Sequence, residues 1–264
     1  GPMQLRWGTL LVLLASILLS WVPRLDARQV TIHNDRPRRD VNGDYVDAHD
    51  GNIVEHGGTY YLYGEAYGNQ TLATPYPWQS WPRLKVYTSP DMVSWTLQGD
   101  PLPMITGTLW IPNVIYHEPS KKFIMWFGCG GWRTATSDDG IHFTPTGNSF
   151  ASRLGWPART DGTGWMIDDD GTAYVAFASM PSGFDEPVHP AWPGHDAHGY
   201  GHIVSIERLT ANYTHTSYVN VTGWFPDDFV ESPSLFKRKG WYYLTCACAS
   251  SMPMPRPTVV LSSG

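Results

Sequence analysis

The sequence predicts an all-β fold built from a repeated hairpin unit. Three observations support this prediction. One hairpin pattern recurs along the chain, turn-forming and aromatic residues are abundant, and no apolar stretch after the N-terminal segment has the 3.6-residue period of a helix. Aromatic residues make up 14% of the 264 residues, and 26 glycines and 22 prolines supply turn positions. This composition is typical of short strands joined by tight turns.

Each copy of the unit contains a short apolar run, a polar turn and a second run rich in aromatic and β-branched residues. In the first copy the turn His56-Gly57-Gly58 separates Asn52-Ile53-Val54 from a run that begins at Thr59. The four copies span residues 52–63, 113–127, 164–177 and 234–244. Turn residues between two such runs predict an antiparallel hairpin.

A third strand is expected after each hairpin, and a polar turn leads from it toward a fourth. The third strands are predicted at residues 84–87, 132–135, 203–206 and 258–261. A four-stranded sheet repeated in this way is the blade of a β-propeller. The chain supplies three full blades and most of a fourth, so we expect a C-terminally truncated form that lacks its last blade.

The first 28 residues are expected to be a secretory signal peptide. Arg6 precedes an apolar run from Leu10 to Val22, and Ala27 offers a small residue for cleavage. The run is short for a bilayer span, and an uncleaved membrane anchor is the alternative. Asn-x-Ser/Thr sequons, which agree with a secreted glycoprotein, begin at Asn69, Asn212 and Asn220. The propeller domain, incomplete at its C-terminal end, is expected at residues 29–264.

The charge of the chain indicates which partners it can bind. The formal net charge is −6, and nucleic-acid surfaces usually need clustered Lys and Arg. A neutral polysaccharide agrees better with this balance. We therefore expect a carbohydrate partner, no nucleic acid, no membrane contact after signal cleavage, and a monomer.

No cofactor or metal ion is expected. The three cysteines cannot all pair, and Cys246 and Cys248 are too close along an extended strand for an easy bridge. The acidic turn Asp168–Gly171 lacks the other ligands of a calcium loop, so a plain hairpin turn is expected there. A Gly-rich stretch contains four residues that could bind a metal ion but that lack regular ligand spacing: His195, Asp196, His198 and His202.

Three acidic motifs follow one another along the predicted blades. They are Asp47–Asn52 with Gly58–Glu65 in the first blade, Asp161 ahead of Asp168–Tyr174 in the third, and Glu231–Leu244 in the fourth. Together they resemble glycoside hydrolase family 43, and most closely its exo-β-1,3-galactanase-like branch, from about Asp40 to the C-terminus. The resemblance implies a five-bladed β-propeller, of which about three and a half blades are present, and hydrolysis of glycosidic bonds with inversion.

The resemblance also implies three catalytic carboxyl groups in a central funnel. Glu231 would be the general acid, Asp50 the general base, and Asp161 a third acid that orients Glu231 and adjusts its pKa. Inversion places acid and base about 6.5–9.5 Å apart, so that a water molecule fits between them and the sugar. Asp161 is one residue further from its acidic turn than in the family pattern, and a β-bulge would absorb this residue. The alternatives are a solvated strand-end Glu231 and an Asp50 that caps its own turn.

Four residues are candidates for substrate binding: His49, Glu65, Trp110 and Trp165. Glu65 matches a sugar-contacting position of the galactanase branch, and tryptophan rings pack against the C–H faces of sugars. The branch often has glycine at the position of Asp50 and a glutamate at that of Trp110, so the substrate stays open. It is β-1,3-galactan or a glycan that contains arabinose or xylose. A non-catalytic or degenerate carbohydrate-binding propeller is the alternative function.

Overall fold

The computed structural model describes residues 29–68, 83–129, 132–150, 160–179, 202–225, 230–248 and 259–261. The chain divides into two units, Gly1–Ile32 and His33–Gly264, and only residues 29–32 of the first are described. The predicted signal peptide and the stretch from His195 to His198 therefore lie outside the described residues. In the second unit every described element is a strand, except for the 3₁₀ turn η3 (Glu118–Ser120). The predicted all-β fold is confirmed.

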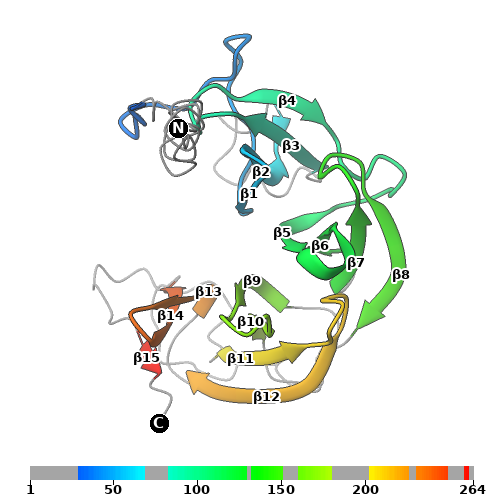
Figure 1. Cartoon of the computed structure of the whole chain (residues 1–264), viewed down its shortest axis with the longest axis vertical. Helices are drawn as coiled ribbons and strands as arrows, with labels where there is room; N and C mark the ends of the chain where they lie inside the picture. The colour runs from blue at the N-terminus through cyan, green and yellow to red at the C-terminus, as the bar shows by residue number, and fades with distance from the viewer. Residues whose placement is uncertain are drawn as a thin grey trace, which may run out of the picture. The chain divides into compact units, whose positions relative to one another are not determined.

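The strands form four antiparallel sheets, and within each sheet they are adjacent in chain order (Figure 1). The first sheet contains β1 (Ile53–His56), β2 (Thr59–Ala66), β3 (Arg83–Ser89) and β4 (Thr96–Gly99). The second contains β5 (Trp110–His117), β6 (Lys122–Gly128), β7 (Trp132–Ser137) and β8 (Thr144–Phe150). The third contains β9 (Thr160–Ile167), β10 (Ala173–Ser179), β11 (His202–Leu209) and β12 (Thr216–Phe225). The fourth contains β13 (Val230–Arg238), β14 (Trp241–Cys248) and β15 (Val259–Leu261).

All four predicted hairpins and all four predicted third strands are present. The β1–β2 turn shows why the local sequence is enough to predict a hairpin. Gly57 and Gly58 are its two loop residues, with φ of 60° and 78°, which is the conformation that a two-residue hairpin loop requires. Lys239 and Gly240 occupy the same places between β13 and β14, with φ of 53° and 79°.

Each sheet packs against the next one in the chain through large apolar side chains. Tyr63 of the first sheet is buried in one cluster with Met125 and Phe127 of the second. Trp126 of the second sheet belongs to a cluster with Phe177 of the third. A third cluster joins sheets three and four. Aromatic and β-branched residues at alternate strand positions thus supply the surfaces that hold the sheets together.

Two asparagines at equivalent positions of the repeat join the first strands of neighbouring sheets. The side chain of Asn52 donates to the carbonyl of Val114 (2.8 Å) and accepts from its N–H (2.9 Å), as a paired strand would. Asn113 donates to the carbonyl and the hydroxyl of Thr163, at 3.1 and 3.2 Å. These bonds hold the first strands of the first three sheets next to one another.

A charged cluster links sheets three and four. Lys237 of β13 donates to Asp168 (2.5 Å) and Asp169 (2.8 Å) in the β9–β10 turn, and the hydroxyl of Tyr242 donates to the other oxygen of Asp168 (2.5 Å). The acidic turn is therefore a hairpin turn, as predicted, whose carboxylates accept hydrogen bonds from the next sheet. The hydrogen bond from Lys237, helped by that from Tyr242, lowers the pKa of Asp168 to about 2.

Replacing Asp168 by asparagine is expected to lower the melting temperature at pH 7 by about one to a few degrees. Because folding lowers the pKa of Asp168, its stabilising effect is present above the pKa of the unfolded chain and disappears as the pH falls toward 2. Thermal unfolding at pH 7 and pH 2 measures this. The exposed Asp169 is the matched control, and Asp169→Asn should lower the melting temperature less than Asp168→Asn does. If the melting temperature of Asp168→Asn stays equally far below that of the native chain at pH 2, the stabilising effect does not come from the ionised Asp168.

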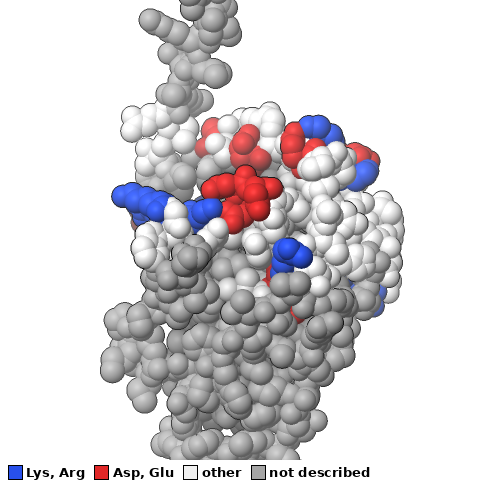
Figure 2. Space-filling model, turned by 60° about the horizontal axis from the view of Figure 1, so that its bottom comes forward, with Lys and Arg blue, Asp and Glu red and all other residues white. Residues whose placement is uncertain are grey.

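The described surface is mixed in charge. On the face in Figure 2, acidic and basic side chains are interspersed among the described residues, and no continuous basic patch covers them. Cys129 is a free thiol. In the part of the chain that the structure describes, no helix has the length and apolar character of a membrane span.

Candidate functional site

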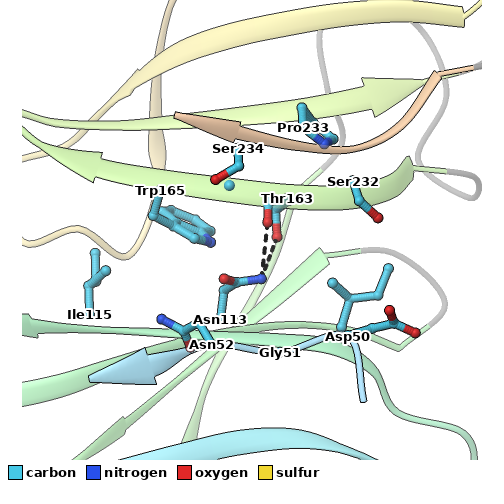
Figure 3. A pocket seen from close by; sticks show the side chains of 12 residues that line it. Asp50, Gly51, Asn52, Asn113, Ile115, Thr163, Trp165, Ser232, Pro233 and Ser234 are labelled. Atoms are coloured by element: carbon cyan, nitrogen blue, oxygen red, sulfur yellow. Dashed lines mark hydrogen bonds between the residues drawn. The ribbon is translucent and has the colours of Figure 1, made fainter. Parts of the chain in front are cut away.

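The first strands of the four sheets meet around a pocket of about 390 Å³. Each sheet contributes three lining residues: 50–52 from the first, 111, 113 and 115 from the second, 163–165 from the third and 232–234 from the fourth. Asp50 and Ser232 lie at one end, whereas Trp165 and Ile115 lie at the other (Figure 3). The pocket is therefore built by residues up to 184 positions apart in the sequence (50 to 234).

Each of the four segments that line the pocket has one extra residue relative to its partner strand. In β9, Thr163 pairs with Phe177 but Asp161 pairs with Ala178, which leaves Gly162 as the extra residue. The bulge that the sequence predicted near Asp161 is thus confirmed.

The other three sheets repeat this shift at the same level. In β5 it lies between Trp110 and Asn113, and in β13 between Glu231 and Ser234. Before β1, His49 pairs with Glu65. The N–H of Tyr63 then bonds to the carbonyl of Asn52, three residues after His49. A bulge bends its strand and redirects side chains, which is why bulges are common beside active sites.

Three residues in these bulges have left-handed backbones and line the pocket. The φ angles are 49° for Asp50, 46° for Ile111 and 48° for Ser232. Aspartate tolerates this conformation, whereas a β-branched residue such as isoleucine adopts it rarely. Strained backbones of this kind persist only where neighbouring groups hold them, and they cluster at functional sites.

Glycine is required where the pocket strands approach other backbone closely. A Cβ at Gly164 would lie 2.2 Å from the carbonyl oxygen of Pro233, and one at Gly51 would lie 2.0 Å from that of Tyr63. The first contact brings β9 against β13, and the second brings the Asp50 segment against β2. Both contacts determine where the carboxyl-bearing segments sit.

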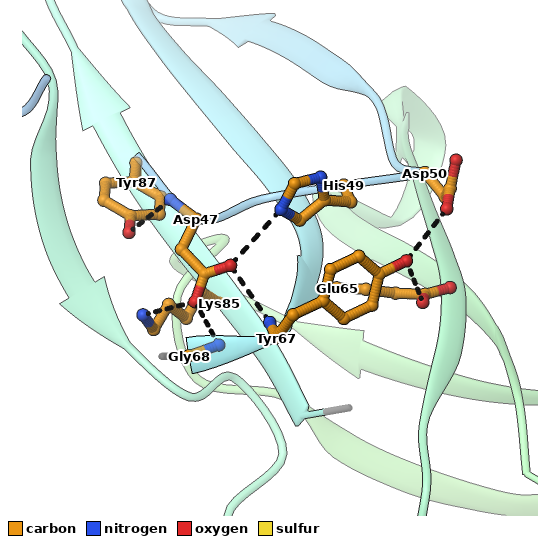
Figure 4. A network of polar contacts seen from close by, with 8 residues as sticks. All are labelled: Asp47, His49, Asp50, Glu65, Tyr67, Gly68, Lys85 and Tyr87. Carbon is orange, nitrogen blue, oxygen red and sulfur yellow. Dashed lines mark hydrogen bonds and ion pairs between the residues drawn. The ribbon is translucent and has the colours of Figure 1, made fainter. Parts of the chain in front are cut away.

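Beside the pocket, two carboxyl groups share one tyrosine hydroxyl. The hydroxyl of Tyr67 lies 3.2 Å from Oδ2 of Asp50 and 3.1 Å from Oε2 of Glu65 (Figure 4). The other oxygen of Glu65 accepts the N–H of Ile111 at 2.6 Å. Asp50 is exposed, whereas Glu65 is only 1% exposed. Glu65 thus supports the strained Ile111 backbone with one oxygen and faces Asp50 through Tyr67 with the other.

The burial of Glu65 raises its pKa to about 7. The negative charge of Asp50 adds to this rise, while the hydrogen bonds from Ile111 and Tyr67 and the nearby His49 oppose it. The pKa of Tyr67 is also raised, by burial and by both carboxyl groups. A carboxyl group that titrates near neutral pH can hold or release a proton under physiological conditions.

A second buried carboxylate holds the residues around Asp50 in place. Asp47 accepts the N–H groups of Tyr67 (3.0 Å) and Gly68 (2.9 Å) and the ammonium of Lys85 (3.1 Å), and lies 3.4 Å from Nε2 of His49. Burial acts to raise the pKa of Asp47, but the bonds with these partners outweigh it and hold that pKa well below its ordinary value. The ring of His49 stacks on Tyr67 at 4.4 Å. Asp47 therefore positions both residues that flank the Asp50 carboxylate (Figure 4).

The predicted catalytic residues lie on three of the pocket strands or next to them. Asp50 lines the pocket. The backbones of Asp161 and Glu231 lie on β9 and β13, and Glu231 directly precedes the lining residue Ser232. The side chains of Asp161 and Glu231 lie outside the described part of the structure.

The predicted binding residues divide into two groups. Trp165 lines the pocket, with its ring 4.6 Å from that of Trp126. Trp110 is half-buried in β5, next to the lining residue Ile111. His49 and Glu65 belong to the polar network beside Asp50.

Sequence reasoning assigned no role to Tyr67, Asp47, Asn52 or Asn113. A signal for Tyr67 was present, because it follows Tyr63 and Glu65 at alternate positions, and all three are buried. The asparagines were visible as Asn52 and Asn113 at the start of two repeat copies. Among the described residues, no cluster of three or more His, Cys, Asp or Glu side chains is placed to hold a metal ion.

Comparison with known proteins identifies the family. The family model "Glycosyl hydrolases family 43" matches residues 45–263. The chain belongs to this family. Its first, third and fourth sheets carry the three motifs on which the family resemblance was based. No curated protein matches the chain in a sequence search.

Solved structures share the fold of this family 43 chain. An exo-β-1,3-galactanase from Phanerochaete chrysosporium, crystallised with galactose, is 25% identical with a TM-score of 0.61, over 83% of this chain and 48% of that one. An exo-β-1,3-galactanase from Clostridium thermocellum is 22% identical with a TM-score of 0.59, over 83% and 46%. A putative exo-β-1,3-galactanase from Bifidobacterium bifidum is 20% identical with a TM-score of 0.57, over 81% and 66%. The chain spans about half the length of the first two.

Proposed function

We propose that this family 43 member is a secreted, monomeric glycosidase on a five-bladed β-propeller scaffold, which cleaves O-glycosidic bonds with inversion. The observation that carries the proposal is the pocket where the first strands of four sheets meet. Asp50 lines that pocket, and the backbones of Asp161 and Glu231 lie on two of its strands. Family membership and the fold shared with galactanases support the same activity.

In this proposal the carboxyl groups have distinct roles. Asp50 removes a proton from a water molecule that attacks the anomeric carbon, and Glu231 donates a proton to the leaving oxygen. Asp161 orients Glu231 and keeps its pKa high enough for it to carry that proton. The exposure of Asp50 agrees with its role, because a base must be reached by water.

The pocket suits one end of a glycan chain. Its volume of about 390 Å³ falls within the usual range for small-ligand sites. Trp165 supplies an apolar ring surface at one end, and Asn113, Thr163 and Ser234 add polar groups. We propose β-1,3-galactan as the first substrate to test, because solved relatives are exo-β-1,3-galactanases, one of them with bound galactose. Glycans that contain arabinose or xylose are the alternative.

Glu231→Gln is expected to lower kcat by about 10²–10⁴-fold while sugar affinity changes little, because the amide keeps the shape but cannot protonate the leaving group. Sugar release from β-1,3-galactan and calorimetric titration with a galacto-oligosaccharide measure the two effects. Glu118→Gln, at an exposed residue of η3, is the matched control and should keep full activity.

Two outcomes decide against the proposal. Hydrolysis retained in Glu231→Gln would remove Glu231 from the acid role. A native chain that binds the oligosaccharide but releases no sugar from any of the three glycan types would indicate the carbohydrate-binding alternative. Proton NMR of the first product distinguishes inversion from retention by the anomer formed.

A further inference from the structure

The single proton of the Tyr67 hydroxyl cannot form hydrogen bonds to both Asp50 and Glu65. The Tyr67 hydroxyl has one hydrogen but lies within hydrogen-bond distance of an oxygen of each carboxyl group. It can donate to only one of them. The other contact is a hydrogen bond only if that carboxyl group carries a proton and donates to the tyrosine oxygen. Without that proton, two negative oxygens face one hydrogen.

Burial indicates which carboxyl group carries the proton. Asp50 is exposed, and water can stabilise its charge. Glu65 is 1% exposed, and the one other described hydrogen bond of its carboxyl group comes from the N–H of Ile111. The pKa of Glu65 is raised to about 7, mainly because of this burial, so below neutral pH its carboxyl group is protonated. A negative charge is therefore less costly on Asp50 than on Glu65.

We propose that Glu65 is a positioning residue for the base: its proton is donated to the Tyr67 oxygen, so that the Tyr67 hydroxyl donates to Asp50. The chain of donors then runs in one direction, from Glu65 through Tyr67 to Oδ2 of Asp50. This fixes one oxygen of Asp50 and leaves the other available to a water molecule. The inference rests on the proposed role of Asp50 as the general base.

The groups around Glu65 make this arrangement responsive to pH. Asp50 and His49 face it from the segment before β1, and Tyr67 faces it from the end of β2. From β5 the Ile111 N–H faces its other oxygen. Beyond His49, the charge of Asp47 is paired with Lys85 of β3. The loss of the Glu65 proton above neutral pH therefore creates a second negative charge that meets Asp50 across a single hydroxyl.

The same ionisation acts on the pocket wall. Glu65 Oε1 accepts the N–H of Ile111, which lines the pocket in a left-handed conformation. An ionised carboxylate accepts this bond more strongly than a neutral carboxyl group does. Ionisation of Glu65 thus removes its donation to the Tyr67 oxygen and strengthens the hydrogen bond that it accepts from Ile111. The buried Glu65 thus couples the orientation of Asp50 to the backbone of Ile111 in the pocket wall.

The test follows the carboxyl ¹³C signals of Glu65 and Asp50 by NMR in the full chain labelled at Asp and Glu, from pH 4 to 9. We expect Glu65 to titrate near pH 7 and the Asp50 signal to shift in the same range. In Tyr67→Phe the Asp50 response near pH 7 should shrink at least twofold, because the relay is lost. Glu65→Gln should abolish the response, since the amide donates to Tyr67 at every pH. The buried Glu207 is the matched control, and Glu207→Gln should leave the response intact.

Each result has one interpretation. Titration of Glu65 near its ordinary pKa overturns the proposal. So does an Asp50 response near pH 7 that survives in Glu65→Gln, or one that shrinks less than twofold in Tyr67→Phe. These signals require no substrate, so they decide the relay even if the chain hydrolyses no glycan. If hydrolysis occurs, the pH profile of kcat should lose a step near pH 7 in Glu65→Gln. A purely structural Glu65 would lower kcat equally at all pH values.

Discussion

Replacing Asp50 by asparagine is expected to lower kcat for glycan hydrolysis by about 10²–10⁴-fold, the usual contribution of a general base. The amide cannot take a proton from water, but its oxygen can still accept the Tyr67 hydroxyl. Asparagine also tolerates the φ of 49° found here, so the backbone should stay in place. Initial rates on the best substrate, with thermal unfolding of the same samples, separate chemistry from folding.

Asp50→Ala is the informative companion to this variant. Alanine cannot accept the Tyr67 hydroxyl. It also lacks the short polar side chain that lets aspartate and asparagine tolerate the left-handed region, where other residues with a Cβ pay about 1–2 kcal/mol. We expect the same loss of activity as in Asp50→Asn, together with a measurable loss of stability. Full activity in a folded Asp50→Asn protein would remove Asp50 from the base role and leave it as a turn residue.

Among the proposed variants, the largest loss of stability is expected for Gly164→Ala. The added Cβ would lie 2.2 Å from the carbonyl oxygen of Pro233, and backbone cannot rotate away as a side chain does. Either β13 moves or β9 distorts, and overpacking of this kind costs about 1–3 kcal/mol or more. Denaturant unfolding measures the loss. Sugar affinity should fall as well, because Gly164 and Pro233 both line the pocket.

Gly128→Ala is the matched control for this prediction. Gly128 also lies in a strand, but the Cβ added there would meet the Cβ of Trp110 at 3.2 Å, a contact that a small shift relieves. Its destabilisation should therefore be smaller, and sugar affinity should fall less than in Gly164→Ala. If both variants lose the same stability and affinity, the close approach of β9 and β13 does not determine the pocket.

Much of the strand arrangement could be predicted from local sequence. Gly57-Gly58 and Lys239-Gly240 specify tight turns, because residues in left-handed conformations are needed there and are present. The apolar and aromatic runs on either side then pair as strands. The position of Asp161 also led to a correct expectation, since the extra residue in the sequence is an extra residue in β9.

The site was predictable only in part. The family resemblance indicated Asp50, which lines the pocket. The two oxygens of Glu65 are engaged by Ile111 and Tyr67, and the family resemblance indicated neither contact. Nothing in the local sequence indicates that Ile111, 46 positions away from Glu65, adopts a left-handed backbone that needs a buried acceptor.

The sequence by itself determined the hairpins, their order and the family, because turn chemistry and strand alternation act over a few residues. Only the tertiary structure decided that four first strands carry the same one-residue shift and meet at one pocket. It also decided that Asp50 and Glu65 share a hydroxyl. These features depend on backbone approach and on burial, and both arise only when segments distant in the chain pack together. A carboxyl group acquires its pKa from those neighbours, which the linear sequence does not specify.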